Sequence, residues 1–419
     1  MTTENYNFHG LFHNSTDSSF IKKLDLDQRC LDALDGAVKK VKETLTPVLR
    51  KIAEAAGVVE PNYRSPRYRL QGSKVYGTQN SPAHTPEQQV DVDLGTYLAA
   101  TFLDTIAQQD GKKLPVPAKH IAKIYFETVD EALRVLCRKE GWKYLDGNEK
   151  KHNCCRIDLS PKGVDAHIDV PLYAMPNQEF EKLEKAAIAL DSINFAEATM
   201  RQNLASQIDE DGWEELDVVV MATRQGEWSE SDVQKVILHF REASSRIGHP
   251  VILRRLWRYV KAWRDQNWRE GGGPSSILLM EAVTRIIEDT QSASYELLEG
   301  GRDDRILAHL FTHLGWHLND DVTVTWGTEP ESLNRGTQDE RQEWVSAVNR
   351  CAKTFDRCFV DTQLTPAQVI GLVTQQFGQR IPSNTSLVKS TRQSPALLGL
   401  GIAQVQVSPQ ERVRSTQGA

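Results

Sequence analysis

The sequence has 419 residues, with 50 Lys and Arg against 57 Asp and Glu, so its formal net charge is −7. Hydrophobic residues make up 39% and charged residues 26%, which excludes a disordered chain, a collagen-like repeat and a coiled coil. No apolar run reaches the roughly 18 residues that a membrane span needs. The first residues lack the basic and apolar regions of a secretory signal, and six cysteines are too few for a disulfide framework. We therefore expect a cytoplasmic protein without a membrane partner.

The first part of the chain predicts a mixture of helices and strands. Apolar residues recur every three or four positions over residues 25–56 and 117–139, which predicts two long amphipathic helices. Four shorter stretches have the pattern of strands, namely 67–71, 90–98, 153–159 and 166–173.

Beyond residue 177 the pattern is mostly helical. Helices are predicted over 179–190, 232–245, 251–268, 274–289, 305–314 and 339–355, with one strand over 215–222. From residue 383 onward Ser, Thr, Gln and Pro dominate, which predicts a mobile tail. The predicted fold class is α+β. We expect an N-terminal helix and sheet domain over 1–200, a mainly helical lobe over 201–382 and the tail over 383–419.

Three aspartates are candidates for a metal site. Alternate residues of a strand share a face, so Asp91 and Asp93 project together while their apolar neighbours face a core. Asp169 has the same parity in a later strand, together with His167, and Asp165 near the preceding turn is its rival. Carboxylates this close repel one another unless a cation offsets their charge, and a hard divalent cation with oxygen ligands is the natural candidate.

Two glycine-containing turns offer hydrogen-bond donors to a phosphate. Gly72 permits a tight turn, and Ser73 would place a hydroxyl and an amide at a helix start. Lys261 lies in a long predicted helix, and the glycine-rich turn 271–276 after it ends in two serines at the next helix start. Neither turn matches the P-loop pattern, which argues against a P-loop NTPase. Together with the aspartates, these turns indicate two-metal nucleotidyl transfer.

Longer segments carry a resemblance to a known family. They are Gln71-Gly72-Ser73-x-x-Tyr76-x-Thr78, Asp91-Val-Asp-Leu-Gly-Thr-Tyr97, His167-Ile-Asp-Val-Pro-Leu-Tyr-Ala-Met-Pro176, Lys261-Ala-Trp-Arg-Asp265 and Gly272-Gly-Pro-Ser-Ser276. In this order they resemble the DncV-like CD-NTases of CBASS antiphage systems, a branch of the polymerase-β-like nucleotidyltransferases. The resemblance implies a mixed-sheet palm that carries the carboxylates and a helical lobe that closes over the nucleotides. It also implies an enzyme that joins two nucleoside triphosphates into a cyclic dinucleotide and releases pyrophosphate twice.

The resemblance implies a role for each candidate residue. The catalytic and metal-binding residues would be Asp91, Asp93 and Asp169, which would hold two Mg²⁺ ions that Mn²⁺ can replace. The donor triphosphate would be bound by Ser73, Lys261 and Ser276. Tyr76 and Tyr173 would stack on bases, unless they are aromatic residues at the edge of the core. The remaining nucleotide-binding positions would be Gln71, Gly72, Arg156, Ser231, Asp232 and Ser275, of which Gln71, Ser231 and Asp232 would read base edges.

The expected substrates are ATP and GTP, and the expected product is 3′,3′-cyclic GMP-AMP or another purine cyclic dinucleotide. The residues Gly418 and Ala419 resemble a C-terminus that an E1/E2-like protein conjugates. Two alternatives stay open. An RNA-tailing or CCA-adding enzyme needs a cationic track for its polyanion, so the acidic net charge argues against it and no DNA or RNA partner is expected. An inactive nucleotide-binding module is disfavoured because all three carboxylates are intact.

Overall fold

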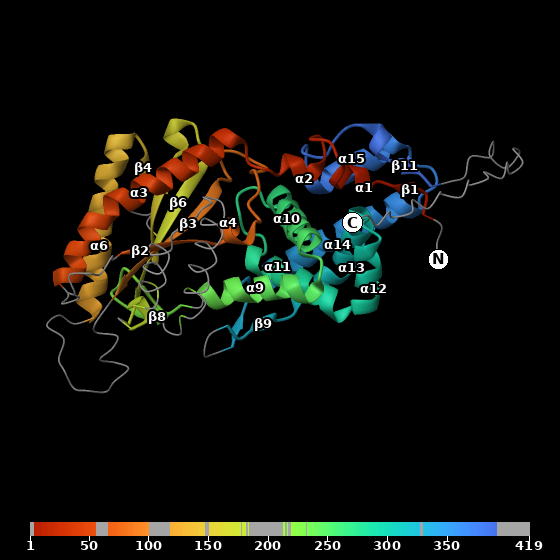
Figure 1. Ribbon diagram of the computed structural model, residues 1–419. Coiled ribbons are helices and arrows are strands. Elements are labelled where there is room, and N and C mark those ends of the chain that lie inside the picture. The colour runs from red at the N-terminus through yellow and green to blue at the C-terminus, as the bar shows by residue number, and fades with distance from the viewer. Residues whose placement is uncertain are drawn as a thin grey trace, which may run out of the picture.

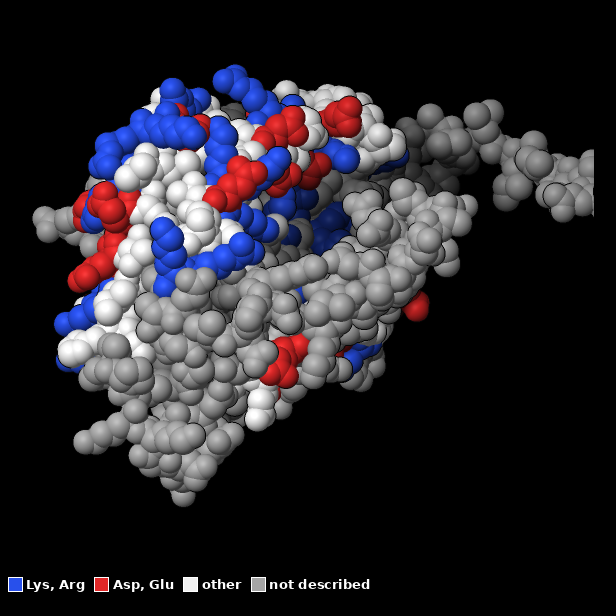
Figure 2. All heavy atoms as spheres, turned by 60° about the vertical axis from the view of Figure 1, so that its left-hand side comes forward, with Lys and Arg blue, Asp and Glu red and all other residues white. Residues whose placement is uncertain are grey.

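The computed structural model describes residues 4–55, 66–99, 118–146, 151–176, 178–181, 183, 213, 216, 219–231, 233–326 and 330–391. These residues form two lobes, a sheet-bearing palm on the left of Figure 1 and a helical lobe on the right. Each lobe has its own cluster of buried apolar side chains. Figure 2 shows the palm side with Lys and Arg interspersed with Asp and Glu over the visible described surface.

The palm is built on a mixed sheet. Its strands follow one another in the order β2 (Arg67–Gln71), β3 (Val90–Ala99), β6 (Ala166–Met175), β5 (Cys154–Asp158) and β4 (Lys143–Tyr144). β7 (Val220–Ala222) pairs with β6 and with β8 (Trp228–Glu230). The central pair β3 and β6 is parallel, whereas β2 and β5 flank it in antiparallel orientation. Every residue of β6 is buried. In the strand order, β3 and β6 lie in the middle of the sheet.

Two long helices pack against this sheet. They are α3 (Gln28–Ala55) and α6 (Ala118–Glu140), which lie side by side in Figure 1. The apolar stripe of α3, with Val41, Leu45 and Leu49 fully buried, is the one that its three- and four-residue spacing predicts. This packing confirms the helix predictions for the first part of the chain.

The helical lobe contains the remaining long helices. They are α9 (Val233–Ile247), α10 (Pro250–Asn267), α11 (Ser276–Asp289), α12 (Gln291–Glu299), α13 (Asp303–Asn319), α14 (Gln338–Val360) and α15 (Pro366–Phe377). A short hairpin of β9 (Thr323–Val324) and β10 (Glu331–Ser332) lies between α13 and α14. The core is rich in aromatic rings, among them Trp263, Phe311 and Phe377. Among the described helices, none combines the length and the hydropathy needed to cross a bilayer.

The N-terminal segment belongs to the helical lobe, which corrects the predicted domain of 1–200. It contains β1 (Tyr6–Asn7), α1 (His9–Phe12) and α2 (Phe20–Lys23), and α3 begins only after it. Phe8 and Phe12 are fully buried in the helical core, and the backbone N–H of Phe8 donates to Asp304 Oδ2 at 2.9 Å. The chain thus starts in one lobe and crosses to the other, because its first aromatic residues are buried there.

Two other predicted boundaries also shift. β7 and β8 extend the sheet, so the palm continues to residue 230 instead of ending at 200. Residues 383–391, predicted as the start of the tail, are part of the fold, since β11 (Lys389–Ser390) pairs with β1 and Val388 is buried. Backbone hydrogen bonds to β1 hold this polar segment in the fold. Side-chain composition does not indicate backbone pairing, so the segment was predicted as part of the tail. Gly418 and Ala419 lie outside the described residues.

Candidate active site

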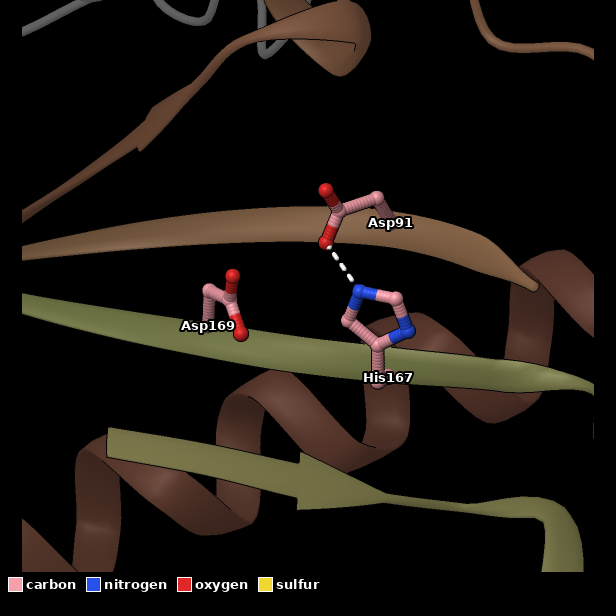
Figure 3. Close-up of side chains that lie close together, drawn as sticks. All are labelled: Asp91, His167 and Asp169. Carbon is pink, nitrogen blue, oxygen red and sulfur yellow. Dashed lines mark ion pairs between the residues drawn. The ribbon is translucent and has the colours of Figure 1, made fainter. Parts of the chain in front are cut away.

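The register of the central strands brings the predicted acidic residues together. Asp93 lies opposite Asp169 and Asp91 lies opposite His167 across the parallel pair of β3 and β6. Figure 3 shows Asp91 on β3 and Asp169 and His167 on β6, with their polar ends turned toward one another. One ligand atom of each of these three residues lies within 4.8 Å of the others. The rival Asp165 is exposed on the turn before β6 and lies outside this trio.

Two basic side chains offset the negative charge of this cluster. His167 Nε2 lies 2.6 Å from Asp91 Oδ1, and the other ring nitrogen lies 3.2 Å from Gln89 Oε1. Arg156, opposite Asp169 on β5, donates two hydrogen bonds to that carboxylate and lies 3.9 Å from Asp91. Burial would raise the pKa of Asp91, but the hydrogen bond and charge of His167, together with the charges of Arg156 and Lys151, outweigh this effect and lower that pKa. Arg156, expected at a base or phosphate, is therefore paired with a carboxylate.

Asp93 lies directly over the backbone of Gly72. A Cβ atom at position 72 would be 2.3 Å from Asp93 Oδ2, and Gly72 has a φ of +60°. Only glycine suits this position, both for its backbone conformation and for the carboxylate beside it. Burial, together with the charges of Asp91 and Asp169, raises the pKa of Asp93 to about 7. A cation bound at this cluster would favour the ionised form of Asp93.

Gly72→Ala is expected to lower activity far more than it lowers stability. The matched control is Gly163→Ala, because Gly163 has a φ of +75° and no atom within 4 Å of an added Cβ. Both variants place alanine at a positive φ, which costs about 1–3 kcal/mol. Gly163 has the left-handed conformation, whereas Gly72 has a ψ of −143°, which is essentially restricted to glycine, so Gly72→Ala is the more strained of the two. Only Gly72→Ala displaces Asp93. Thermal unfolding and pyrophosphate release check this. Equal activity in the two variants would show that the contact with Asp93 is unimportant.

A cleft of about 460 Å³ opens beside the carboxylates and contains the residues predicted to bind a triphosphate. Ser73, Lys261 and Ser276 line it together with Asp91 and Asp93. It therefore brings together residues from α4 (Ser73–Tyr76), α10 and α11. Cationic and hydroxyl groups facing carboxylates suit a triphosphate that is bound together with divalent cations.

The Lys261 ammonium is buried in this cleft. Its Nζ donates to the carbonyl oxygen of Thr78 at 2.7 Å and to the Thr78 hydroxyl at 3.3 Å. Burial, reinforced by the charge of Arg264, lowers the pKa of Lys261 to about 7. Arg264 also lines the cleft and donates from Nη1 to Ser276 Oγ at 2.7 Å. Arg264 was not predicted as a site residue, although its spacing of three residues from Lys261 places both on one helix face.

Ser275 has a different position from its neighbour Ser276. It is exposed, and its side chain accepts a hydrogen bond from the backbone N–H of Leu278 as the N-cap of α11. It is not among the residues that line the cleft. Ser275 therefore acts as a helix cap here, and the predicted contact with a nucleotide is not supported by its geometry.

A second pocket, of about 360 Å³, adjoins the first. Gly72, Tyr76, Asp93 and Ile277 line both. The residues that line only the second pocket are mostly apolar, with Asp169 as the charged one among them. They are Gln71, Asn153, Cys154, Asp169, Pro171, Tyr173, Met221, Val233 and Val236. Asp93 thus borders a polar cleft on one side and a largely apolar pocket on the other.

Two predicted base-binding residues are occupied by contacts within the core. Tyr173 is 2% exposed, and its ring stacks on Tyr97 with centroids 4.7 Å apart. Its hydroxyl donates to Gln71 Oε1 at 3.1 Å, while Gln71 Nε2 donates to the Tyr97 hydroxyl at 2.6 Å. Tyr173 therefore packs on Tyr97 in the core and also lines the second pocket, and the amide of Gln71 is hydrogen-bonded to both tyrosines. Tyr76 is half-buried, borders both pockets and keeps one edge against Phe240.

The other predicted base-reading residues are not brought to either pocket. Ser231 precedes α9, its backbone N–H donates to the carbonyl oxygen of Val219 at 2.9 Å, and its side chain bonds to Tyr173. It lines neither pocket. Asp232 lies outside the described residues.

Comparisons with known proteins show the family of this chain. The nucleotidyltransferase domain of the cyclic GMP-AMP synthase DncV-like family matches residues 66–173, and the cyclic GMP-AMP synthase C-terminal domain matches residues 251–391. A cyclic GMP-AMP synthase from Escherichia coli is 31% identical over 359 residues, covering 80% of this chain and 72% of that protein. A cyclic GMP-AMP synthase from Vibrio cholerae is 30% identical over 340 residues, covering 79% and 71%.

Solved structures share the fold. The crystal structure of Vibrio cholerae DncV cyclic AMP-GMP synthase in complex with the linear intermediate 5′ pppA(3′,5′)pG matches with a TM-score of 0.69 and 24% identity. It covers 93% of this chain and 100% of that chain. The same enzyme in complex with GTP and 5MTHFGLU2 matches with a TM-score of 0.69 and 23% identity, over the same shares. By its two matching domains and its curated relatives, the chain belongs to the DncV-like family of cyclic GMP-AMP synthases, which are nucleotidyltransferases.

Proposed function

We propose that this protein makes a cyclic dinucleotide from two nucleoside triphosphates. The observation that carries the proposal is the position of Asp93 between two pockets, one lined by cations and hydroxyls and one largely apolar. The first suits a triphosphate, and the second suits the flat face of a nucleobase. A donor and an acceptor nucleotide therefore meet at one carboxylate cluster. The names of the curated relatives and the matching C-terminal domain support cyclic GMP-AMP, or another purine cyclic dinucleotide, as the product of ATP and GTP. The 3′,3′ linkage of this product is what the resemblance implies.

The donor set of the cluster fits a hard divalent cation. A carboxylate oxygen of Asp91 and one of Asp169 lie within 4.8 Å of each other, close enough to bind the same cation. Asp93 lies beside them, opposite Asp169. These three residues would hold two Mg²⁺ ions, with Mn²⁺ as a substitute. When bound, such ions lower the pKa of an attacking ribose hydroxyl and offset the charge of the leaving pyrophosphate.

The remaining chemistry belongs to side chains of the two lobes. Lys261, Ser73 and Ser276 bind the donor triphosphate and orient its α-phosphorus toward the cluster. Asp169 lies beside the second pocket, where it accepts the proton of the attacking hydroxyl, and Arg156 fixes the direction of that carboxylate by two hydrogen bonds. Each transfer forms one phosphodiester bond and releases one pyrophosphate. After the first transfer, the linear product presents its own triphosphate to its own remaining hydroxyl.

Incubation with each pair of labelled nucleoside triphosphates and Mg²⁺, followed by phosphatase, tests the proposal. A labelled product that resists phosphatase is the expected result. Phosphatase-sensitive tails on added RNA would support the RNA-tailing alternative. The absence of any product with all nucleotide pairs, with Mg²⁺ and again with Mn²⁺, would support the inactive module. Either outcome would overturn the proposal.

Three finer parts belong to the proposal. A cytoplasmic location follows from the sequence composition, whereas a role in antiphage defence and conjugation of the C-terminus by an E1/E2-like protein follow from the resemblance. For conjugation, removal of Gly418 and Ala419 is expected to abolish conjugates when the E1/E2-like partner is present. Unchanged conjugates in the truncated protein would contradict it, whereas synthesis of the cyclic product should be the same in both forms.

A further inference from the structure

Two histidines of the helical lobe lie side by side on α13. His309 and His313 share one face of this helix because they are four residues apart, and their ring centroids are 4.5 Å apart. Both residues are half-buried, so solvent still reaches them. Neither lines the cleft or the second pocket beside the carboxylates. The pair is therefore separate from the candidate active site.

The ring of His309 is held through one of its two nitrogens. Its Nε2 lies 2.9 Å from the Thr290 hydroxyl and 3.3 Å from the Ser294 hydroxyl, at the start of the neighbouring helix α12 (Figure 1). The Thr290 hydroxyl donates its own hydrogen to the carbonyl oxygen of Ile286, so it accepts from His309 Nε2–H. Nδ1 of the neutral ring then has the free lone pair. Burial lowers the pKa of His309, and the charge of His313 lowers it further, which favours the neutral ring.

The ring of His313 is held in the same way. Its Nδ1 lies 2.8 Å from the carbonyl oxygen of His309, one turn earlier. Because a carbonyl oxygen only accepts, Nδ1 carries the proton, and Nε2 of the neutral ring has the free lone pair. Within the described part of the chain, no group forms a hydrogen bond with Nδ1 of His309 or with Nε2 of His313. Each ring thus has one nitrogen fixed by the fold and one nitrogen left for a ligand.

We propose that His309 and His313 bind a transition-metal cation such as Zn²⁺ through these two nitrogens, with water in the remaining coordination positions. Histidines that ligate a metal almost always donate their other ring N–H to a group that fixes the ring, and both rings here do so. Two histidines four residues apart on one helix face are a recurring arrangement of zinc ligands. Imidazole suits Zn²⁺, Ni²⁺ and Cu²⁺, whereas carboxylates suit Mg²⁺. This site and the carboxylates of the palm therefore take different metals.

Titration of the untagged protein with Zn²⁺, followed by calorimetry in excess Mg²⁺, tests the proposal. His309→Ala and His313→Ala are each expected to weaken Zn²⁺ binding by at least about 10-fold, because even the outer partners of metal ligands are worth 10- to 100-fold. His317→Ala is the matched control, since His317 is the next histidine on this helix face, while the His313 ring contacts the rings of His309 and Trp316. It should bind Zn²⁺ as wild type does. Equal Zn²⁺ affinity in wild type, His309→Ala and His313→Ala would overturn the proposal.

Thermal unfolding gives a second readout that does not depend on catalysis. Zn²⁺ binds the folded protein and should raise the melting temperature of wild type and of His317→Ala, but not that of His313→Ala. Thr290→Val keeps both ligands and removes the hydroxyl that holds the His309 ring, so it should weaken Zn²⁺ binding by roughly 10-fold. If the metal-free His313→Ala protein proves unstable, Thr290→Val decides, and wild-type affinity in that variant would contradict the proposed site. The outcome is independent of the proposed function, because cyclic dinucleotide synthesis is not measured.

Discussion

Asp93→Asn is expected to lower the rate of pyrophosphate release by at least about 100-fold, because even the outer partners of metal ligands are worth 10- to 100-fold. The carboxylate borders both pockets, which under the proposed function hold the donor and the acceptor nucleotide. Asparagine keeps the size of the side chain but removes the charge that a divalent cation needs. Radiolabelled nucleotide turnover at saturating Mg²⁺ measures the loss.

The same change is expected to stabilise the metal-free protein at high pH. Burial and the charges of Asp91 and Asp169 raise the pKa of Asp93 from 3.8 to about 7. The folded state therefore binds a proton that the unfolded state has already lost, so the free energy of unfolding decreases as pH rises from about 4 to 7. Asparagine has no ionised form, so Asp93→Asn should melt higher than wild type at pH 8 with a chelator present, and no higher at pH 4.

Added metal should reverse this order. Mg²⁺ binds the folded protein and raises the melting temperature of wild type, whereas Asp93→Asn should respond little. Asp165→Asn is the control, since Asp165 is an exposed aspartate on the turn before β6, and it should keep wild-type activity and the wild-type response to Mg²⁺. Wild-type turnover in Asp93→Asn would remove this residue from the metal site.

Local pattern was sufficient to predict which faces of the strands carry the acidic residues. Strand alternation put Asp91 and Asp93 on one face and Asp169 on the corresponding face of its strand, because side chains alternate with a period of two. It contained no information on which strands pair. The opposition of Asp93 to Asp169, and of Arg156 to Asp169, depends on the order β3, β6 and β5 in the sheet. The pairing of Arg156 with a carboxylate was missed for this reason.

Long-range packing also explains the other differences. Strand alternation is the same whether the ring of Tyr173 faces a ligand or another ring. The stacking of Tyr173 on Tyr97 depends on the pairing of their strands and could not be predicted from the local pattern. Phe8 and Phe12 belong to a segment too short for a helical period, so the sequence did not assign it to the lobe that buries it. Residues 383–391 are similar, since β11 is defined by its hydrogen bonds to β1.

Lys261→Met is expected to raise the KM for the donor nucleotide by roughly 10- to 150-fold, the equivalent of one hydrogen bond to a charged group. A charged, buried Lys261 lowers the free energy of unfolding when no nucleotide is bound. The reason is that burial and the charge of Arg264 lower the pKa of Lys261 from 10.5 to about 7. The ionised form therefore destabilises the fold, fully below pH 7 and progressively less as pH rises toward 10.5. Lys261→Met should accordingly melt higher than wild type at pH 6.

Binding of a triphosphate to Lys261 should also take up a proton. At pH 8 the Lys261 side chain of the nucleotide-free protein is mostly the neutral amine, because its pKa is about 7. The negative charge of a bound triphosphate raises this pKa, so the amine takes up a proton. The binding enthalpy of a non-hydrolysable nucleoside triphosphate, measured by calorimetry, should then depend on the ionisation enthalpy of the buffer. Lys261→Met should remove that dependence, whereas Lys235→Met, which changes an exposed lysine of α9, should keep it. A wild-type binding enthalpy that is the same in all buffers at pH 8 would show that Lys261 does not change its protonation state. Ser73, Ser276 and Arg264 would then hold the triphosphate without protonation of Lys261.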